Sequence, residues 1–301
     1  MKKVLFLCLA LSLVGGAAMA QDLGLTAGLE FHIGALNDSD IDAMDTGIIR
    51  PVLIWQNSDL VDNLDLFARV GVPFWTSSPL GDSPWLGVDL TLRGTYSLDI
   101  SPSGTLGFSL TSQNVFLAFD DEINTAVRTP AFMWANWLGT DGVPDTMGRL
   151  VPGVRYTHAL EGMSFYGQAT VPFLLYSGGE DPFDLVGLDF VLGWNMDMDF
   201  GYIGAELELT NRLRLGGSAA DDFFHWLTVT PFISFGPLYA EVVVMMPLTE
   251  ENRVYSGTAI IPEVRYEIIE NFRVFVNLPV YRIGSDHDVR LSFGMGVNFS
   301  F

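Results

Sequence analysis

The chain has 301 residues and carries 36 Asp and Glu against 15 Lys and Arg, a formal net charge of −21. A surface this acidic repels a polyanion, which excludes nucleic acid as a partner. Hydrophobic residues make up 49% of the chain and aromatic residues 13%, which excludes a disordered protein. We expect one folded domain, because no linker-like stretch divides the sequence.

The N-terminus has the pattern of a secretory signal peptide. Lys2 and Lys3 precede an apolar stretch over 4–14, and Ala18-Met19-Ala20 supplies a small-x-small cleavage site. The apolar stretch is about 11 residues long, against the roughly 20 that a spanning helix needs. We therefore predict a signal peptide over 1–20 and a mature domain over 21–301. Cys8 is the one cysteine, so the mature domain contains no disulfide or thiolate site.

The mature sequence alternates apolar and polar residues with a period of two, which is typical of β-strands. Leu64 and Leu66, for example, fall on one face of a strand and Asp65 falls on the other. A helix over the uncharged stretch 223–240 is disfavoured by its internal prolines. The expected strands cover residues 23–34, 48–55, 64–75, 86–98, 106–111, 150–158, 163–176, 185–195, 201–211, 223–235, 238–246, 259–268, 272–281 and 289–301.

Short and long connections alternate along the chain. Short ones fall at 99–104, 159–162, 195–199, 236–237 and 269–271, and longer loops rich in Gly, Ser, Asp and Pro lie between them. This parity is typical of a transmembrane barrel with short periplasmic turns and long outer loops. We predict an all-β protein: a single antiparallel transmembrane β-barrel of about 14 strands, with 12 or 16 as alternatives. The other alternative is a soluble β-sandwich or secreted adhesin, which needs far less apolar strand surface.

A weak internal repeat has the length of a hairpin. The stretch from Pro152 to Tyr156 is echoed from Pro262 to Tyr266, and the region between Pro51 and Phe74 looks like a degenerate third copy. Each copy continues through a turn into a strand that contains another proline. We expect these prolines near the outer rim, where a missing backbone donor is tolerated.

The last thirteen residues, 289–301, alternate without interruption and end on Phe301, with Phe299 on the same apolar face. This stretch resembles the closing strand of outer-membrane β-barrels of diderm bacteria, which are porin-like proteins. In that family the C-terminal aromatic residue is part of the assembly signal. The resemblance therefore implies that Phe299 and Phe301 serve in assembly, that the outer-membrane assembly machinery and outer-membrane lipid are partners, and that the protein resides in the cell outer membrane.

The face opposite the apolar one carries nearly all the charge of the strands, and we expect it to line the lumen. A charge turned toward lipid at mid-bilayer costs roughly 2 to 4 kcal/mol for Arg, which fixes the register. These groups form either a pore lining or a network of ion pairs, and the two are compatible. The pore-lining candidates are Glu30, Asp65, Arg69, Asp89, Arg93, Arg155, Asp189, Glu206, Glu208, Glu241, Glu263, Arg265, Arg273 and Arg290.

Two loops stand out. The longest, 119–148, resembles by position the inward-folded loop that constricts general porins, which makes Asp120, Asp121 and Glu122 candidates for a constriction. Alternatively, 125–138 forms a hairpin above the membrane. The acidic loop over 37–45 lacks the glycine and the glutamate of a calcium-binding loop, so we interpret it as a solvated loop.

We predict a passive channel for ions or small solutes with a modest preference for cations. Acidic pairs such as Asp221-Asp222 faintly resemble those of outer-membrane proteases, but they arise by composition in acidic loops, and His158 has no matching serine for a lipase. We therefore expect no enzyme and no catalytic, cofactor-binding or metal site. The alternatives are a plugged structural or surface-interaction barrel without transport, and a transporter of hydrophobic compounds, whose family carries an N-terminal plug that is not evident here.

Overall fold

The computed structural model describes residues 24–35, 46–72, 74–75, 87–117, 146–177, 185–214, 223–248, 259–269, 272–277, 280–283 and 288–300. The predicted signal peptide lies outside these residues. No helix in the described part of the chain is long and apolar enough to cross a membrane.

All regular structure in the described residues is β-strand, in one antiparallel sheet of 17 segments. The expected strands are present, and several extend further toward the long loops than the alternation indicated. The segments are β1 (Leu25–Ala35), β2 (Thr46–Val61), β3 (Leu64–Gly71), β4 (Phe74–Trp75), β5 (Gly87–Ser101), β6 (Gly104–Leu117), β7 (Thr146–Leu160), β8 (Met163–Thr170), β9 (Phe173–Ser177), β10 (Leu185–Met198), β11 (Gly201–Arg214), β12 (Phe223–Phe235), β13 (Leu238–Pro247), β14 (Ala259–Ile269), β15 (Phe272–Asn277), β16 (Val280–Ile283) and β17 (Asp288–Ser300).

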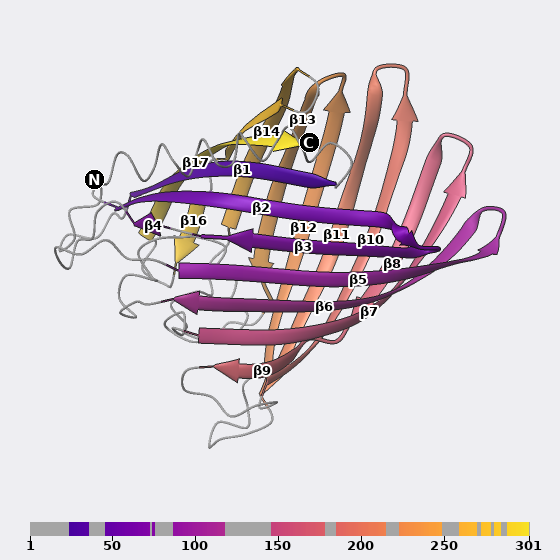
Figure 1. The fold of residues 1–301 in the computed structure, drawn as a ribbon, viewed down its shortest axis with the longest axis horizontal. Helices are drawn as coiled ribbons and strands as arrows, with labels where there is room; N and C mark the ends of the chain where they lie inside the picture. Colours follow the sequence, from indigo (N-terminus) through magenta and orange to yellow (C-terminus); the bar gives the residue numbers. More distant parts are fainter. Residues whose placement is uncertain are drawn as a thin grey trace.

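The sheet closes on itself as an up-and-down barrel. Each strand pairs with the strands before and after it in the chain, and β1 completes the circle by pairing with both β2 and β17. Figure 1 shows β1 to β9 crossing in front of β10 to β14, as expected of tilted strands on opposite walls of a barrel. Closure joins the two ends of the described sheet, as a bilayer requires, because it offers no hydrogen-bonding partner to a free sheet edge.

Three barrel strands are split into two segments each. β3 with β4, β8 with β9, and β15 with β16 each occupy a single place in the sheet, so the 17 segments make 14 barrel strands. At one split, Val171 donates to the carbonyl of Pro152 and Gly187 donates to the carbonyl of Pro172. Neither proline returns a bond, because proline has no N–H. In the sequence the other two splits contain Pro73 and Pro279.

The split hairpins are the three copies of the internal repeat, which confirms that the repeating unit is a hairpin. Pro152 is well inside β7, and the register continues past the split from Thr170 to Phe173 without a shift. The prolines therefore lie within the barrel wall rather than at its outer rim. The ladder continues through the split, and a register shift follows between Gly148 and Arg149.

The two ends of the barrel differ. Tight two-residue turns at 62–63, 102–103, 161–162, 199–200 and 236–237 lie at the right and top in Figure 1, and the other ends of these strands lie at the opposite end of the barrel. Asn63, Gly162 and Gly236 have φ of 66°, 69° and 54°, the left-handed conformation that tight hairpin turns require. The start of β1 pairs with the end of β17, so both ends of the strand array meet at the barrel wall.

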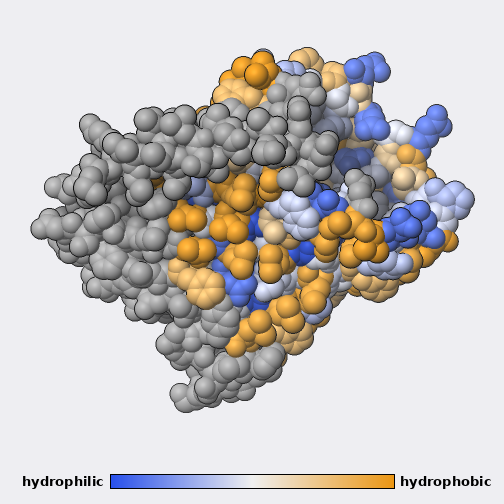
Figure 2. Space-filling model, viewed as in Figure 1, coloured by the Kyte–Doolittle hydropathy of each residue, from blue (hydrophilic) through white to orange (hydrophobic). Residues whose placement is uncertain are grey.

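The outer face of the wall is apolar. On β10, Leu188, Phe190, Leu192 and Trp194 are all exposed, with 63% of Leu192 accessible. Figure 2 shows apolar residues spread over the described wall and hydrophilic residues gathered at the right, where the turns lie. Exposed aromatic residues mark the turn end of this band, as in the girdles of transmembrane barrels: Tyr96, Tyr156, Phe200, Phe235 and Tyr266.

Candidate functional site

The interior of the barrel contains a cavity of about 850 Å³. Its walls come from β3, β5 to β8 and β10 to β13, so it occupies the lumen rather than a cleft between loops. Most of the uncharged lining is hydroxyl or amide, which suits water-filled space. These side chains are Thr95, Ser97, Thr105, Ser109, Thr111, Gln113, Thr157, Gln168, Thr170, Thr210, Thr228 and Thr230.

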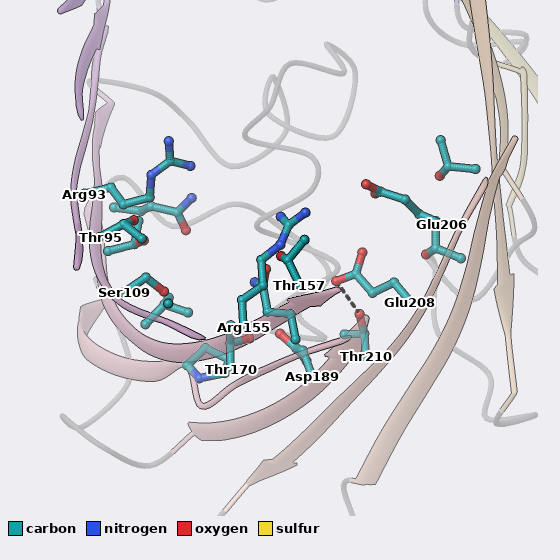
Figure 3. Close-up of a pocket in the computed structure, with 18 of the residues that line it drawn as sticks. Arg93, Thr95, Ser109, Arg155, Thr157, Thr170, Asp189, Glu206, Glu208 and Thr210 are labelled. Carbon is teal, nitrogen blue, oxygen red and sulfur yellow. Dashed lines mark hydrogen bonds between the residues drawn. The ribbon is translucent and has the colours of Figure 1, made fainter. Parts of the chain in front are cut away.

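Most of the positive charges and most of the negative charges that line the cavity lie on different walls of the barrel (Figure 3). All three arginines, Arg93, Arg149 and Arg155, come from β5 and β7. Four of the five carboxylates come from β10, β11 and β13, and the fifth belongs to β3. The carboxylates are Asp65, Asp189, Glu206, Glu208 and Glu241. A solute in the cavity therefore meets a basic wall on one side and an acidic wall on the other.

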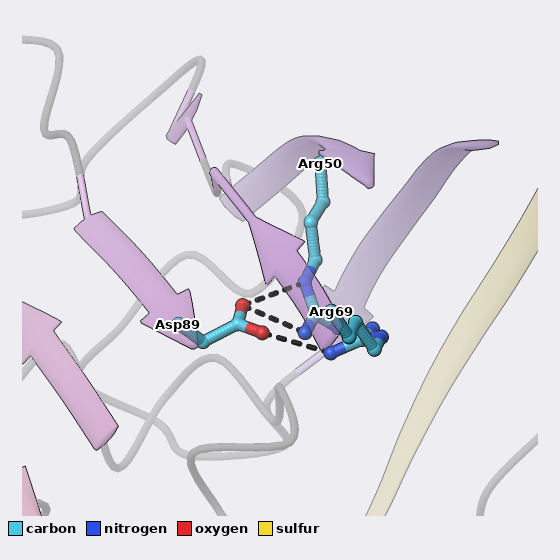
Figure 4. Close-up of polar contacts among 3 residues, drawn as sticks. All are labelled: Arg50, Arg69 and Asp89. Carbon is cyan, nitrogen blue, oxygen red and sulfur yellow. Dashed lines mark hydrogen bonds and ion pairs between the residues drawn. The ribbon is translucent and has the colours of Figure 1, made fainter. Parts of the chain in front are cut away.

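An ion triad braces β2, β3 and β5 beside the cavity (Figure 4). Arg50 donates from Nε and Nη2 to Oδ2 of Asp89 at 3.1 and 2.7 Å, and Arg69 donates to Oδ1 at 2.8 Å. The side chain of Arg50 is only 2% exposed. Gly71 lies beneath this contact, and a Cβ there would be 2.4 Å from Oδ2 of Asp89. The triad is a structural brace, because its charges are directed at one another.

Two arginines of the basic wall are held by aromatic rings. The guanidinium of Arg155 stacks on Tyr166 at 3.7 Å from the ring centroid, and that of Arg93 stacks on Phe67 at 4.8 Å. Tyr166 passes over Gly193 and donates its hydroxyl to Glu206 on β11. Tyr166 thus connects the basic wall to the acidic one.

A second arginine, tyrosine and glutamate group lies on β13 and β14. Arg265 lies 5.0 Å from the ring centroid of Tyr239, and Tyr239 donates its hydroxyl to Glu241 at 2.7 Å. Arg265 also bonds to Glu241 at 3.1 Å and to Glu263. Arg155 and Arg265 occupy the same position in the internal repeat. The repeat therefore places an arginine inside the barrel and a tyrosine, Tyr156 or Tyr266, outside it.

One arc of the cavity is apolar. Trp226, Val243 and Met245 line it on β12 and β13, and Trp226 and Met245 are 8% and 9% exposed. This arc adjoins the acidic wall, because Thr228 pairs with Glu208 on one side and with Met245 on the other.

The structure brings half of the predicted pore-lining residues together in the cavity: Asp65, Arg93, Arg155, Asp189, Glu206, Glu208 and Glu241. Arg69 and Asp89 belong to the triad, and Glu263 and Arg265 belong to the second tyrosine group. Arg273 lies 3.8 Å from Glu267 in an exposed pair. At Glu30 and Arg290 the structure describes only the backbone, in β1 and β17.

Several lumen residues were missed by the sequence analysis. Arg50 occupies a strand whose two faces are both apolar in sequence, so alternation could not assign it a side. Arg149 falls just outside the range expected for its strand. The roles of Tyr166 and Tyr239 depend on neighbouring strands and have no local signal.

The constriction candidates Asp120, Asp121 and Glu122 lie outside the described residues, as do Phe301 and the acidic loop over 37–45. Within the described part of the chain, no three His, Cys, Asp or Glu side chains gather in a way that would hold a metal ion.

A closed antiparallel barrel with an apolar outer face and a charged lumen has the architecture of a transmembrane β-barrel. No family model matches the sequence, and the search of curated proteins found no match. Solved structures with a similar fold include the following three.

The KdgM porin is 9% identical and has a TM-score of 0.40 over 92% of this chain and 99% of its own. A triple mutant of the Rhodopseudomonas blastica porin is 12% identical and has a TM-score of 0.41. The match covers 93% of this chain and 100% of the porin chain. A mutant of the TodX monoaromatic hydrocarbon channel is 9% identical. Its TM-score is 0.47, and the match covers 92% of this chain and 88% of the TodX chain.

Proposed function

We propose that the mature chain is a porin-like channel of the outer membrane that passes ions or small solutes with a modest preference for cations. The observation that carries this proposal is the cavity of about 850 Å³, lined by charged and hydroxyl side chains, inside a barrel whose outer face is apolar. A barrel with lipid outside and polar groups inside has its polar surface where water and solutes pass.

The location follows from the outer face and from the N-terminal pattern. The exposed leucines and phenylalanines of the wall would be unfavourable in water, whereas outer-membrane lipid solvates them. A signal peptide over 1–20 would deliver the chain to the periplasm, and the outer-membrane assembly machinery would insert it. Phe299 pairs with Ala27 across the seam between β17 and β1, so the proposed assembly signal belongs to the strand that closes the barrel.

The lining of the cavity supports the proposed preference for cations. Among the described residues, five carboxylates and three arginines line it, so this part of the lining is net negative. The acidic loops, if they surround the mouths as the sequence predicts, would add negative charge there and concentrate cations near the entrance. The excess is small, so the preference is modest.

The test is conductance of the purified, refolded protein in a planar lipid bilayer. An ohmic step that appears on insertion, with a reversal potential favouring cations in a salt gradient, is the expected result. A folded, inserted barrel that passes no current identifies the plugged structural barrel instead. The protein is expected to need no cofactor and to catalyse no reaction.

A further inference from the structure

The arginines of the lumen differ in how they are held. Arg50, Arg69 and Arg265 each form an ion pair with a carboxylate of the barrel wall. Arg93 and Arg155 stack on aromatic faces, and neither forms an ion pair with a carboxylate among the described residues. A stacked guanidinium keeps its N–H donors in the plane of the group, directed away from the ring, where a carboxylate can bind.

The acidic wall faces these donors across the same cavity. Glu206 and Glu208 lie on β11, and Asp189 lies on the neighbouring strand β10. An ammonium group is attracted to this wall and repelled by the other, and a carboxylate behaves in the opposite way. A solute that carries both groups is stabilised at both walls, whereas a solute with one charge gains at one wall only.

The apolar arc supplies a third element of recognition. Val243 and Met245 line the cavity on β13, and Met245 lies in the same cross-strand row as Glu208, with Thr228 of β12 between them. A solute whose ammonium group lies at the acidic wall therefore places any neighbouring apolar group against this arc. Burial of that group adds about 0.8 kcal/mol of stabilisation for each methylene removed from water.

We propose that the lumen favours zwitterionic solutes that carry one apolar group, such as an apolar amino acid or a dipeptide that contains one. The proposal rests on the proposed channel function, because the solute must have access to the lumen. It adds a substrate class that channel activity alone does not require. The cavity volume of about 850 Å³ accommodates such a solute together with water.

The experiment measures osmotic swelling of liposomes that contain the refolded protein. L-phenylalanine is the apolar zwitterion, L-serine the polar zwitterion and mannitol the uncharged solute. We expect phenylalanine to enter faster than mannitol, with serine between them. Equal rates for phenylalanine and mannitol would overturn the proposal while leaving the channel intact. If no solute enters and no current flows, the channel function fails, and this proposal fails with it.

Two variants separate the elements of recognition. Val243→Thr keeps the shape but replaces a methyl group by a hydroxyl, so the ratio of phenylalanine to mannitol rates should fall by about threefold. The neighbouring Val244→Thr, on the outer face, is the matched control and should leave the ratio unchanged. Arg93→Gln combined with Arg155→Gln should lower the ratios of both amino acids to mannitol. Ratios that all three proteins share with the wild type would overturn the proposal.

Discussion

Arg50 places both Nε and Nη2 on one carboxylate oxygen of Asp89, at 3.1 and 2.7 Å, and Gly71 lies beneath the contact on the strand between them. The arginine is almost fully buried, so Asp89 balances a charge that lies away from water. Removing one member of a buried pair leaves an uncompensated charge, which is far less favourable than removing both members.

We expect Asp89→Asn to destabilise the barrel by about 3 kcal/mol, because it removes a carboxylate that pairs with both the buried Arg50 and Arg69. The temperature at which the folded band converts to the unfolded one in a heat-modifiability gel should fall. The double variant Arg50→Met, Asp89→Leu should recover most of the loss. Asp65→Asn is the control, since the carboxylate of Asp65 meets only an exposed amide at 3.3 Å. A double variant as unstable as Asp89→Asn would contradict this account.

Gly193 provides the space through which Tyr166 crosses from the basic wall to Glu206. A Cβ at Gly193 would be 2.2 Å from Cζ of Tyr166, so Gly193→Ala must displace the ring. We expect a loss of about 1 to 3 kcal/mol in stability and an altered single-channel conductance, because Arg155 loses the ring on which it stacks. Gly167→Ala is the matched control, because its Cβ would meet Leu192 at an ordinary 3.6 Å. Wild-type conductance in Gly193→Ala would show that Tyr166 does not position Arg155.

The closed barrel and its 14 strands could be predicted from the alternation of apolar and polar residues together with the alternation of short and long connections. The lengths of the strands could not be predicted in this way. On β6 the outer face continues through Ser112 and Asn114, which bond to each other at 3.0 Å and hide the end of the apolar pattern. Contacts that cross two strands, such as Tyr166 with Glu206, depend on neighbours that the sequence does not place side by side.

Substitutions on β10 and on the neighbouring strand β8 test which face of the barrel wall is directed toward lipid and which toward the lumen. Leu192 is in the middle of the strand and is 63% exposed on the outer face. Leu192→Arg should destabilise the protein in bilayers by about 2 to 4 kcal/mol, because the charge is held in lipid. Gln168→Arg, in the neighbouring strand but lining the cavity, should fold like the wild type. Measuring denaturant unfolding from liposomes compares the two, and equal losses would contradict the assignment.

The seam between β1 and β17 closes the barrel, so loss of the last residues should prevent folding. Phe299 pairs with Ala27 on one side and with Phe272 on the other, and Ser300 pairs with Thr26. Deleting residues 299–301 removes these pairs together with Phe301. We expect the truncated chain to show no heat-modifiable band and to be degraded in the periplasm. Ser300→Ala keeps the backbone pairing and should assemble normally, whereas a folded, inserted truncation would refute this role for the seam.

Cation preference should depend on the balance of charge in the cavity, where five carboxylates face three arginines. Glu206→Gln with Glu208→Gln makes that balance even, and we expect the reversal potential in a salt gradient to move toward zero. Arg93→Gln with Arg149→Gln should move it the other way. A third variant, with Asp120, Asp121 and Glu122 changed to Asn, Asn and Gln, tests the contribution of the long loop.

The dependence of selectivity on ionic strength distinguishes the contribution of charges in the lumen from that of charges at the mouths. Charges at the mouths act on ions through a distance that falls from about 10 Å at 0.1 M salt to about 3 Å at 1 M, so their contribution should fade as salt rises. Charges that line the cavity are in direct contact with a passing ion and should keep part of their effect. We therefore expect the difference between the wild type and the Glu206 and Glu208 double variant to persist at 1 M salt, whereas the effect of the loop variant disappears. Anion preference in the wild type at every salt concentration would overturn the proposed selectivity.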